Sequence, residues 1–148
     1  MSQPSRLQLT APCGLDCFNC HLYETNITEE MRLKVSQVRG IQPDKVACKG
    51  CRIQGAYILV KPCATLDCIQ KKGLDFCYEC DEFPCLKLAP AQDGANSFPH
   101  NFKLFNLCRM KAIGVERWAE EEALHIRHLY YDGQLVPGSG PVEKKTDA

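Results

Sequence analysis

The sequence lacks any long apolar run and any excess of charge of one sign. No stretch approaches the roughly 18 consecutive apolar residues of a membrane-spanning helix, and the first ten residues hold no apolar segment of the kind that directs secretion. The 18 basic and 18 acidic residues cancel to a formal net charge of zero, so no overall field draws the chain to nucleic acid or anionic lipid. We therefore expect a soluble, cytoplasmic protein with no membrane partner.

The chain also lacks a recognisable catalytic arrangement. Neither a Ser/His/Asp or Cys/His constellation nor a phosphate-binding loop can be identified, which argues against an enzyme. Its 148 residues are enough for one domain with a modest core. We expect a lead-in over residues 1–10, a single cysteine-rich metal-binding domain over 11–132, and a disordered tail over 133–148, where Gly, Pro, Ser and charged residues accumulate.

What the sequence does have is cysteine, 11 residues in all. Thiols stay reduced in the cytoplasm, and an odd number fits a framework of disulfides poorly. Thiolates are the soft ligands that zinc and iron–sulfur clusters select. The cysteine content therefore predicts metal binding, and ten of the eleven cysteines fall into two groups of five.

The first group runs from Cys13 to Cys51. It contains two Cys-x2-Cys pairs separated by an insert of 27 residues, long enough to hold a helix. Two intervening residues let both sulfurs of a pair point into one tetrahedral site. The expected ligands are Cys17, Cys20, Cys48 and Cys51, with Cys13 as an alternate.

The second group places five thiols within 23 residues, from Cys63 to Cys85. The expected ligands are Cys68, Cys77, Cys80 and Cys85, with Cys63 as an alternate. Four thiolates close the coordination shell of zinc, so such sites are structural rather than catalytic. We expect two zinc ions in a zinc finger-like protein that acts as an interaction or regulatory module with an unknown protein partner.

Each group has one thiol more than a tetrahedral site uses, and this leaves alternatives open. The spare thiol could support a ligand, replace one, or belong to a cluster of different geometry, so an iron–sulfur protein in electron transfer or redox sensing is the main alternative. An enzyme that uses Cys13 or Cys63 is another. The order Cys-x3-Cys-x2-Cys also occurs in radical S-adenosylmethionine enzymes, but this chain is too short for their βα architecture.

A local excess of positive charge lies between residues 45 and 72. Zinc with four thiolates carries a net charge of minus two, which these residues would offset, and charge compensation is the favoured interpretation. A nucleic-acid-binding zinc protein is the second alternative. The segment has one acidic residue, Asp67, and six basic ones: Lys45, Lys49, Arg52, Lys61, Lys71 and Lys72.

Apolar spacing and end signals predict several helices. These are one from residue 28 to 38, one from 64 to 72, a short one opening at Pro84, one from Pro99 to Gly114, and one from 115 to 130. Short extended segments are expected at residues 7–9 and 56–60, and a connector at 89–97. Cys108, among apolar neighbours on a predicted helix, is expected in the core. His125 and His128 are expected on a solvated helix face. His21, next to the first cysteine turn, is expected in a surface or packing role, with ligation in place of a cysteine as an alternative.

The predicted fold is therefore a small α-rich metal-binding fold with short β pieces. Its cysteine knuckles and short helices would pack on two C-terminal helices, whose apolar faces supply most of the core. Each knuckle is a tight turn, for which Gly14 and Gly50 provide the backbone freedom.

Several non-cysteine residues around the thiols resemble one family, the small cysteine-rich prokaryotic proteins of domain-of-unknown-function family 3795. The resemblance implies a zinc-binding protein without an established activity. It is carried by Cys13-Gly-Leu-Asp-Cys17-x2-Cys20, Cys48-x-Gly-Cys51, Cys63-x4-Cys68, Gly73-Leu-x-Phe-Cys77-x2-Cys80-Asp-Glu-Phe-Pro-Cys85, Asn106-Leu-x-Arg109 and Ile113-Gly-Val-Glu-x-Trp118.

Overall fold

The computed structural model describes residues 3–58, 61–88, 101–136 and 140–145, and these are mostly helical. None of the described helices is long and apolar enough to cross a membrane. The helices, with 3-10 helices marked η, are η1 (Cys17–Asn19), α1 (Glu29–Arg39), η2 (Pro43–Lys45), α2 (Cys51–Gln54), α3 (Ala64–Lys72), η3 (Cys77–Glu79), η4 (Leu86–Leu88), α4 (Asn101–Ile113), α5 (Val115–Glu121) and α6 (Ala123–Asp132).

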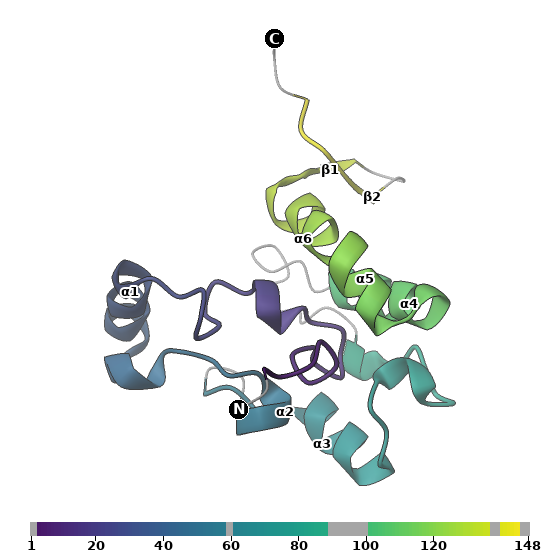
Figure 1. Ribbon diagram of the computed structural model, residues 1–148, viewed down its shortest axis with the longest axis horizontal. Coiled ribbons are helices and arrows are strands. Elements are labelled where there is room, and N and C mark those ends of the chain that lie inside the picture. Colours follow the sequence, from purple (N-terminus) through teal and green to yellow (C-terminus); the bar gives the residue numbers. More distant parts are fainter. Residues whose placement is uncertain (1–2, 59–60, 89–100, 137–139, 146–148) are drawn as a thin grey trace.

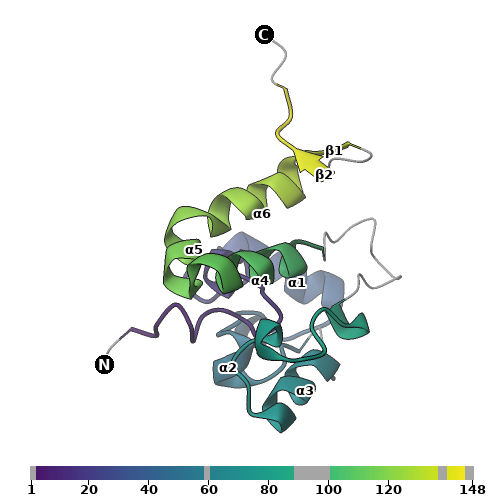
Figure 2. The same cartoon turned by 90° about the vertical axis from the view of Figure 1, so that its right-hand side faces the viewer.

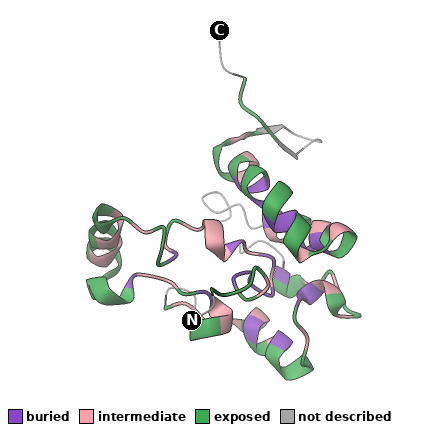
Figure 3. Ribbon diagram, viewed as in Figure 1, coloured by how far each residue is buried: buried purple, intermediate pink, exposed green. Residues whose placement is uncertain are grey.

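The C-terminal helices α4, α5 and α6 form one side of the molecule, and α2, α3 and the cysteine-bearing turns lie on the other (Figures 1 and 2). Helix α1 stands apart at one end in Figure 1, with exposed and half-buried residues only (Figure 3). Strands β1 (Gln134–Val136) and β2 (Gly140–Val142) pair antiparallel beyond α6. Within the segment predicted to be a disordered tail, the structure thus describes two short paired strands.

The core lies where the C-terminal helices meet the second cysteine group. Trp118 and Leu107 are fully buried, and Phe102 and Met110 are almost so. They form one cluster that also includes Ile69 of α3, Phe76, Cys77 and Leu88. The prediction that the C-terminal helices supply the main apolar core is confirmed.

Helices α1 and α3 form where the sequence predicts them, because their end signals are local. The Thr28 side chain accepts a hydrogen bond from the Met31 amide (3.2 Å), and Gly40 ends α1 in the left-handed conformation (φ 64°). Gly73 ends α3 in the same way (φ 66°).

Both predicted extended segments are wrong where the structure describes them. Residues 6–9 form turns that bury Leu9, and residues 56–58 are irregular, with Ile58 exposed. Alternating or consecutive apolar residues predicted strands there, but among the described residues neither segment has a partner strand with which to pair. The rest of the second segment, residues 59–60, lies outside the described residues.

The predicted helix from 115 to 130 is two helices, because the backbone leaves helical geometry at Glu122 (φ −124°, ψ −34°). The Glu122 carboxylate there accepts two hydrogen bonds from the Arg109 guanidinium of α4, at 2.8 and 2.6 Å. These hydrogen bonds hold the pKa of Glu122 below its usual value. The break between α5 and α6 thus coincides with a contact to α4. The spacing of apolar residues from 115 to 130 does not indicate this break.

Two other predictions concern the ends of helices. The short helix predicted at Pro84 is η4, which begins at Leu86 and leaves Cys85 immediately before it. Helix α4 ends at Ile113, before Gly114, as predicted. Its predicted start at Pro99 and the predicted connector at 89–97 lie outside the described residues.

Candidate metal centres in the two cysteine groups

Six cysteines line one cavity of about 220 Å³, which we call the six-thiol cavity. Its wall also includes apolar and aromatic side chains, among them Leu15, Tyr23 and Tyr57, and Lys103 of α4. Cys63, predicted as the alternate of the second group, lies here with the first. The six cysteines are Cys13, Cys17, Cys20, Cys48, Cys51 and Cys63.

The other four grouped cysteines line a second cavity of about 40 Å³, the four-thiol cavity. They are the four that the sequence predicts as ligands of one zinc ion. Helix α3 contributes Cys68, the turn of η3 contributes Cys77 and Cys80, and Cys85 precedes η4. The remaining cavity wall includes Ile69, Phe83 and Leu88, together with charged residues at its edge.

Backbone pairing joins the two Cys-x2-Cys turns of the first group. The Cys48 amide donates to the Leu22 carbonyl (2.8 Å), and the Cys48 carbonyl accepts from the Glu24 amide (2.9 Å). Cys48 is also the partner of Tyr23 in an isolated parallel bridge. The chain just after Cys20 is thereby held beside the start of the second turn, so both pairs of thiols face the same cavity.

The Cys48 sulfur accepts two hydrogen bonds, one from the Gly50 amide (3.4 Å) and one from the Gln54 side chain (3.3 Å). Burial raises the pKa of the Cys48 thiol, and these two donors act in the opposite direction. Gly50 reaches its position with a φ of 88°, which favours glycine. The turn thus supplies two hydrogen-bond donors to this sulfur, and burial remains the larger effect on its pKa.

The cysteines of the six-thiol cavity are half-buried, and their thiols are close enough to influence one another. Burial raises the pKa of Cys51 to about 12, and the neighbouring Cys13 thiolate adds to the effect. The pKa of Cys17 is raised well above its ordinary value, first by burial and then by Cys51 and Cys13. A bound cation would lower these pKa values again, because it stabilises the thiolates that burial and neighbouring negative charge disfavour.

Cys13 lies between the two groups. The Cys77 amide donates to the carbonyl of Pro12, the residue before Cys13, at 3.0 Å. Burial raises the pKa of Cys77 to about 12, and the Cys13 thiolate is the next largest cause. The same thiolate affects Cys51 and Cys17 on the other side, so the two cysteine groups are neighbours joined at one loop.

Two of the basic residues predicted to offset thiolate charge make defined contacts. The Lys72 ammonium donates to the Cys80 sulfur (3.0 Å) and pairs with Glu82. The hydrogen bond from Lys72 lowers the pKa of the Cys80 thiol. Arg52 donates to the Thr10 carbonyl (2.7 Å) and lies over the Phe76 ring at 4.7 Å, so it joins α2 to the second group.

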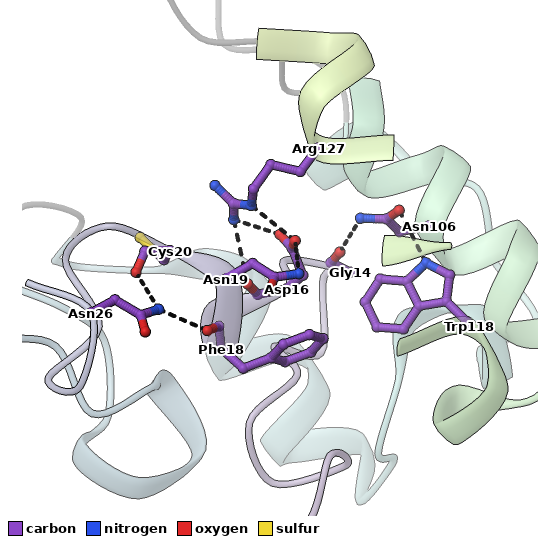
Figure 4. A network of polar contacts seen from close by, with 9 residues as sticks. All are labelled: Gly14, Asp16, Phe18, Asn19, Cys20, Asn26, Asn106, Trp118 and Arg127. Atoms are coloured by element: carbon purple, nitrogen blue, oxygen red, sulfur yellow. Dashed lines mark hydrogen bonds and ion pairs between the residues drawn. The ribbon is translucent and has the colours of Figure 1, made fainter. Parts of the chain in front are cut away.

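The first cysteine loop, residues 13–20, is anchored to the C-terminal helices by a buried ion pair (Figure 4). The Arg127 guanidinium of α6 donates to both carboxylate oxygens of Asp16, at 2.9 and 2.5 Å, and to its carbonyl at 3.3 Å. Asn19 donates to the same carboxylate (3.0 Å). Asp16 has no exposed surface, so its charge depends on these partners.

A second anchor joins the same loop to α4 and α5 (Figure 4). The buried Asn106 amide donates to the Gly14 carbonyl (2.9 Å) and accepts from the Trp118 indole (3.2 Å). Gly14 lies against α4 with a φ of 93°, and a β-carbon there would come within 2.4 Å of the Lys103 carbonyl oxygen. Only glycine fits this approach without a shift of the backbone.

Sequence reasoning missed the anchoring role of Asp16, Asn106 and Arg127. Asp16 and Asn106 both belong to the motifs of the family resemblance, but no local pattern marks Asp16 and Arg127 as partners. Cys108, predicted in the core, is instead exposed on α4, because the buried side of that helix is taken by Phe102, Asn106 and Leu107. His125 and His128 are exposed, as predicted, and His21 takes the surface position rather than a packing role.

The sulfurs face their cavities without meeting at a point. In the part of the chain that the structure describes, no three Cys, His, Asp or Glu side chains form a group that could hold a metal ion in its present arrangement. Soft thiolate donors lining one cavity are nevertheless the donor set that suits zinc or iron–sulfur clusters. Metal would have to draw the thiols of either cavity inward.

The helical fold and the two groups of thiols define a small, mostly helical, cysteine-rich protein. The chain belongs to the family described as protein of unknown function (DUF3795), whose model matches residues 9–90. The match includes all ten grouped cysteines, whereas Asn106, Arg109 and Trp118 lie beyond it. The comparisons found no similar curated protein and no similar solved structure.

Proposed function

We propose that this protein binds metal through its cysteine thiolates, and that the four-thiol cavity takes one structural zinc ion. The observation that carries the proposal is the convergence of Cys68, Cys77, Cys80 and Cys85 on one cavity of about 40 Å³. Four thiolates at about 2.3 Å from the ion are the usual structural zinc shell. Zinc would bind there as the ion that holds α3, η3 and the start of η4 together.

The charge next to this cavity supports the proposal. Lys72 contacts the Cys80 sulfur, and Lys87 also lines the cavity, so positive charge is available to offset a four-thiolate zinc site. This use of Lys72, and the contacts of Arg52 with Thr10 and Phe76, favour charge compensation over a nucleic-acid surface for the basic run.

A closed four-thiolate shell leaves zinc no position for a substrate, so its contribution would be to folding. The activity of the protein would then lie in what its metal-stabilised surface binds, as in an interaction or regulatory module. Leu86, next to the proposed ligand Cys85, is 92% exposed and offers such a surface an apolar contact.

The test is metal analysis of protein purified without added metal. The Cys77→Ser/Cys80→Ser double variant should contain about one zinc ion fewer per chain than the wild type, because it loses half of the ligand set. Cys108→Ser is the matched control, since Cys108 is exposed and lies outside both cavities. Equal zinc in the double variant and the wild type would overturn the proposal.

A further inference from the structure

The two cavities differ in a way that one kind of metal site does not explain. Six thiols surround about 220 Å³ in the first, and four surround about 40 Å³ in the second. A single zinc ion brings its four sulfurs to about 2.3 Å and leaves no space between them. The six-thiol cavity is therefore larger, and richer in donors, than one ion requires.

The residues that line the six-thiol cavity also indicate which kind of metal group it could bind. Besides the thiols it consists mainly of apolar and aromatic side chains, including Leu15, Leu22, Tyr23 and Tyr57. Among the described residues that line it, none is an aspartate, a glutamate or a histidine. Donors that are all soft sulfur, in apolar surroundings, suit iron–sulfur clusters better than hard metal ions.

We infer that the six-thiol cavity holds an iron–sulfur cluster, ligated by thiolates of Cys17, Cys20, Cys48 and Cys51. The inference shares one premise with the proposed function, namely that these thiols bind metal, and it replaces the second predicted zinc ion by a cluster. Such clusters are held by four cysteine thiolates, and their core of iron and sulfide needs internal volume.

Hydrogen bonds and charge around the cavity agree with this assignment. The Cys48 sulfur already accepts from the Gly50 amide and the Gln54 side chain, and hydrogen bonds to ligand sulfurs help to set the reduction potential of such clusters. Lys103 lines the cavity and would balance part of the negative charge of the ligated cluster.

Cys13 and Cys63 are assigned to the wall rather than to the ligand set. The backbone next to Cys13 is fixed by the hydrogen bond that the Cys77 amide donates to the Pro12 carbonyl, although Cys13 itself lines the six-thiol cavity. Cys63 precedes α3, whose Cys68 faces the four-thiol cavity. Both residues are therefore tied to the second group as well as to the first.

The experiment is purification of the full chain under strict exclusion of oxygen, with iron, acid-labile sulfide and zinc measured on the same sample. We expect about two to four iron atoms per chain with an equal amount of sulfide, together with about one zinc ion. Broad visible absorbance should bleach on addition of dithionite.

Variants assign each metal to its cavity. Cys17→Ser and Cys48→Ser should lose most of the iron and sulfide and keep the zinc, whereas Cys77→Ser/Cys80→Ser should lose zinc and keep iron. Cys108→Ser should match the wild type in all three. Cys13→Ser and Cys63→Ser should retain the iron.

Colourless wild-type protein with about two zinc ions and less than one iron atom per chain would overturn the inference and leave the proposed function standing. Wild-type protein with iron and sulfide but no zinc would overturn the proposed zinc site and leave the inference standing. These results do not depend on the variants, so misfolding of a cysteine variant does not obscure them.

Discussion

Arg127 and Asp16 show how single residues hold the first cysteine loop in place. Their side chains are 10% and 0% exposed, so little water screens the pair. Removing one partner from a buried pair is far worse than removing both, because it leaves a charge without compensation. The contribution of each residue to stability thus depends on the presence of its partner.

We predict that Arg127→Ala will lower the free energy of unfolding by about 3–5 kcal/mol, because it leaves the Asp16 carboxylate buried and unpaired. Urea unfolding followed by circular dichroism measures the change. The control is Arg117→Ala, which removes an exposed partner of Glu121 and should cost less than about 1 kcal/mol. Similar losses in the two variants would contradict the role of the buried pair.

The cysteines could be predicted from the sequence, whereas the anchoring residues could not, because the two depend on contacts over different distances along the chain. The cysteines were recognised because their spacing within each turn is a local signal. Asp16 and Arg127 are 111 residues apart, and Gly14 and Asn106 are 92 apart. The residues next to these positions in the sequence do not indicate a partner so far along the chain. Both contacts are therefore known only from the fold.

At the scale of elements, the approach of the first cysteine loop to α4 depends on one glycine. A β-carbon at Gly14 would lie 2.4 Å from the Lys103 carbonyl and 2.9 Å from the Leu107 side chain. Backbone atoms of a helix cannot give way as the end of a flexible side chain can. A larger residue would therefore push the loop away from α4 and weaken the Asn106 hydrogen bond.

We predict that Gly14→Ala will destabilise the fold by about 3 kcal/mol or more, through the clash and the positive φ together. Gly40→Ala is the matched control, because Gly40 also has a positive φ but nothing within 4 Å of its added β-carbon. That variant should cost only about 1–2 kcal/mol. Thermal unfolding of both proteins compares them, and equal shifts would exclude a role for the close approach.

Helices are predictable from the sequence where nearby residues set their ends. They are not predictable where a contact with another element sets the end. Thr28, Gly40 and Gly73 mark the ends of α1 and α3 without help from the rest of the chain. The break at Glu122 coincides with a pair to Arg109 on a different helix. Tyr57 and Ile58 have no partner strand within the described residues, so their β propensity alone does not produce a strand.

At the scale of the whole molecule, the family match and the folding unit do not coincide. The match ends at residue 90, but α4, α5 and α6 bury Phe102, Leu107, Met110 and Trp118 against Phe76 and Ile69. Two anchors of the first cysteine loop also come from these helices. The matched segment therefore relies on residues beyond it for much of its core.

We predict that a chain ending at residue 90 will not fold cooperatively, even with zinc present, because its apolar residues lose the helices that cover them. Limited proteolysis and near-UV circular dichroism of the shortened and full-length proteins test this. The control is removal of residues 143–148, which lie beyond β2 and should leave the unfolding transition unchanged. A protease-resistant fragment 1–90 would show that the matched segment is autonomous.

The anchors of Gly14 and Asp16 have a consequence for the order of events on the ribosome. Synthesis proceeds from the N-terminus, so Cys13, Cys17 and Cys20 emerge early, yet Asn106 and Arg127 are added 92 and 111 positions after the residues they hold. The nascent loop thus lacks these supports until Asn106 and Arg127 have been added. Under the proposed function, its thiols would remain accessible to metal until these helices have been made.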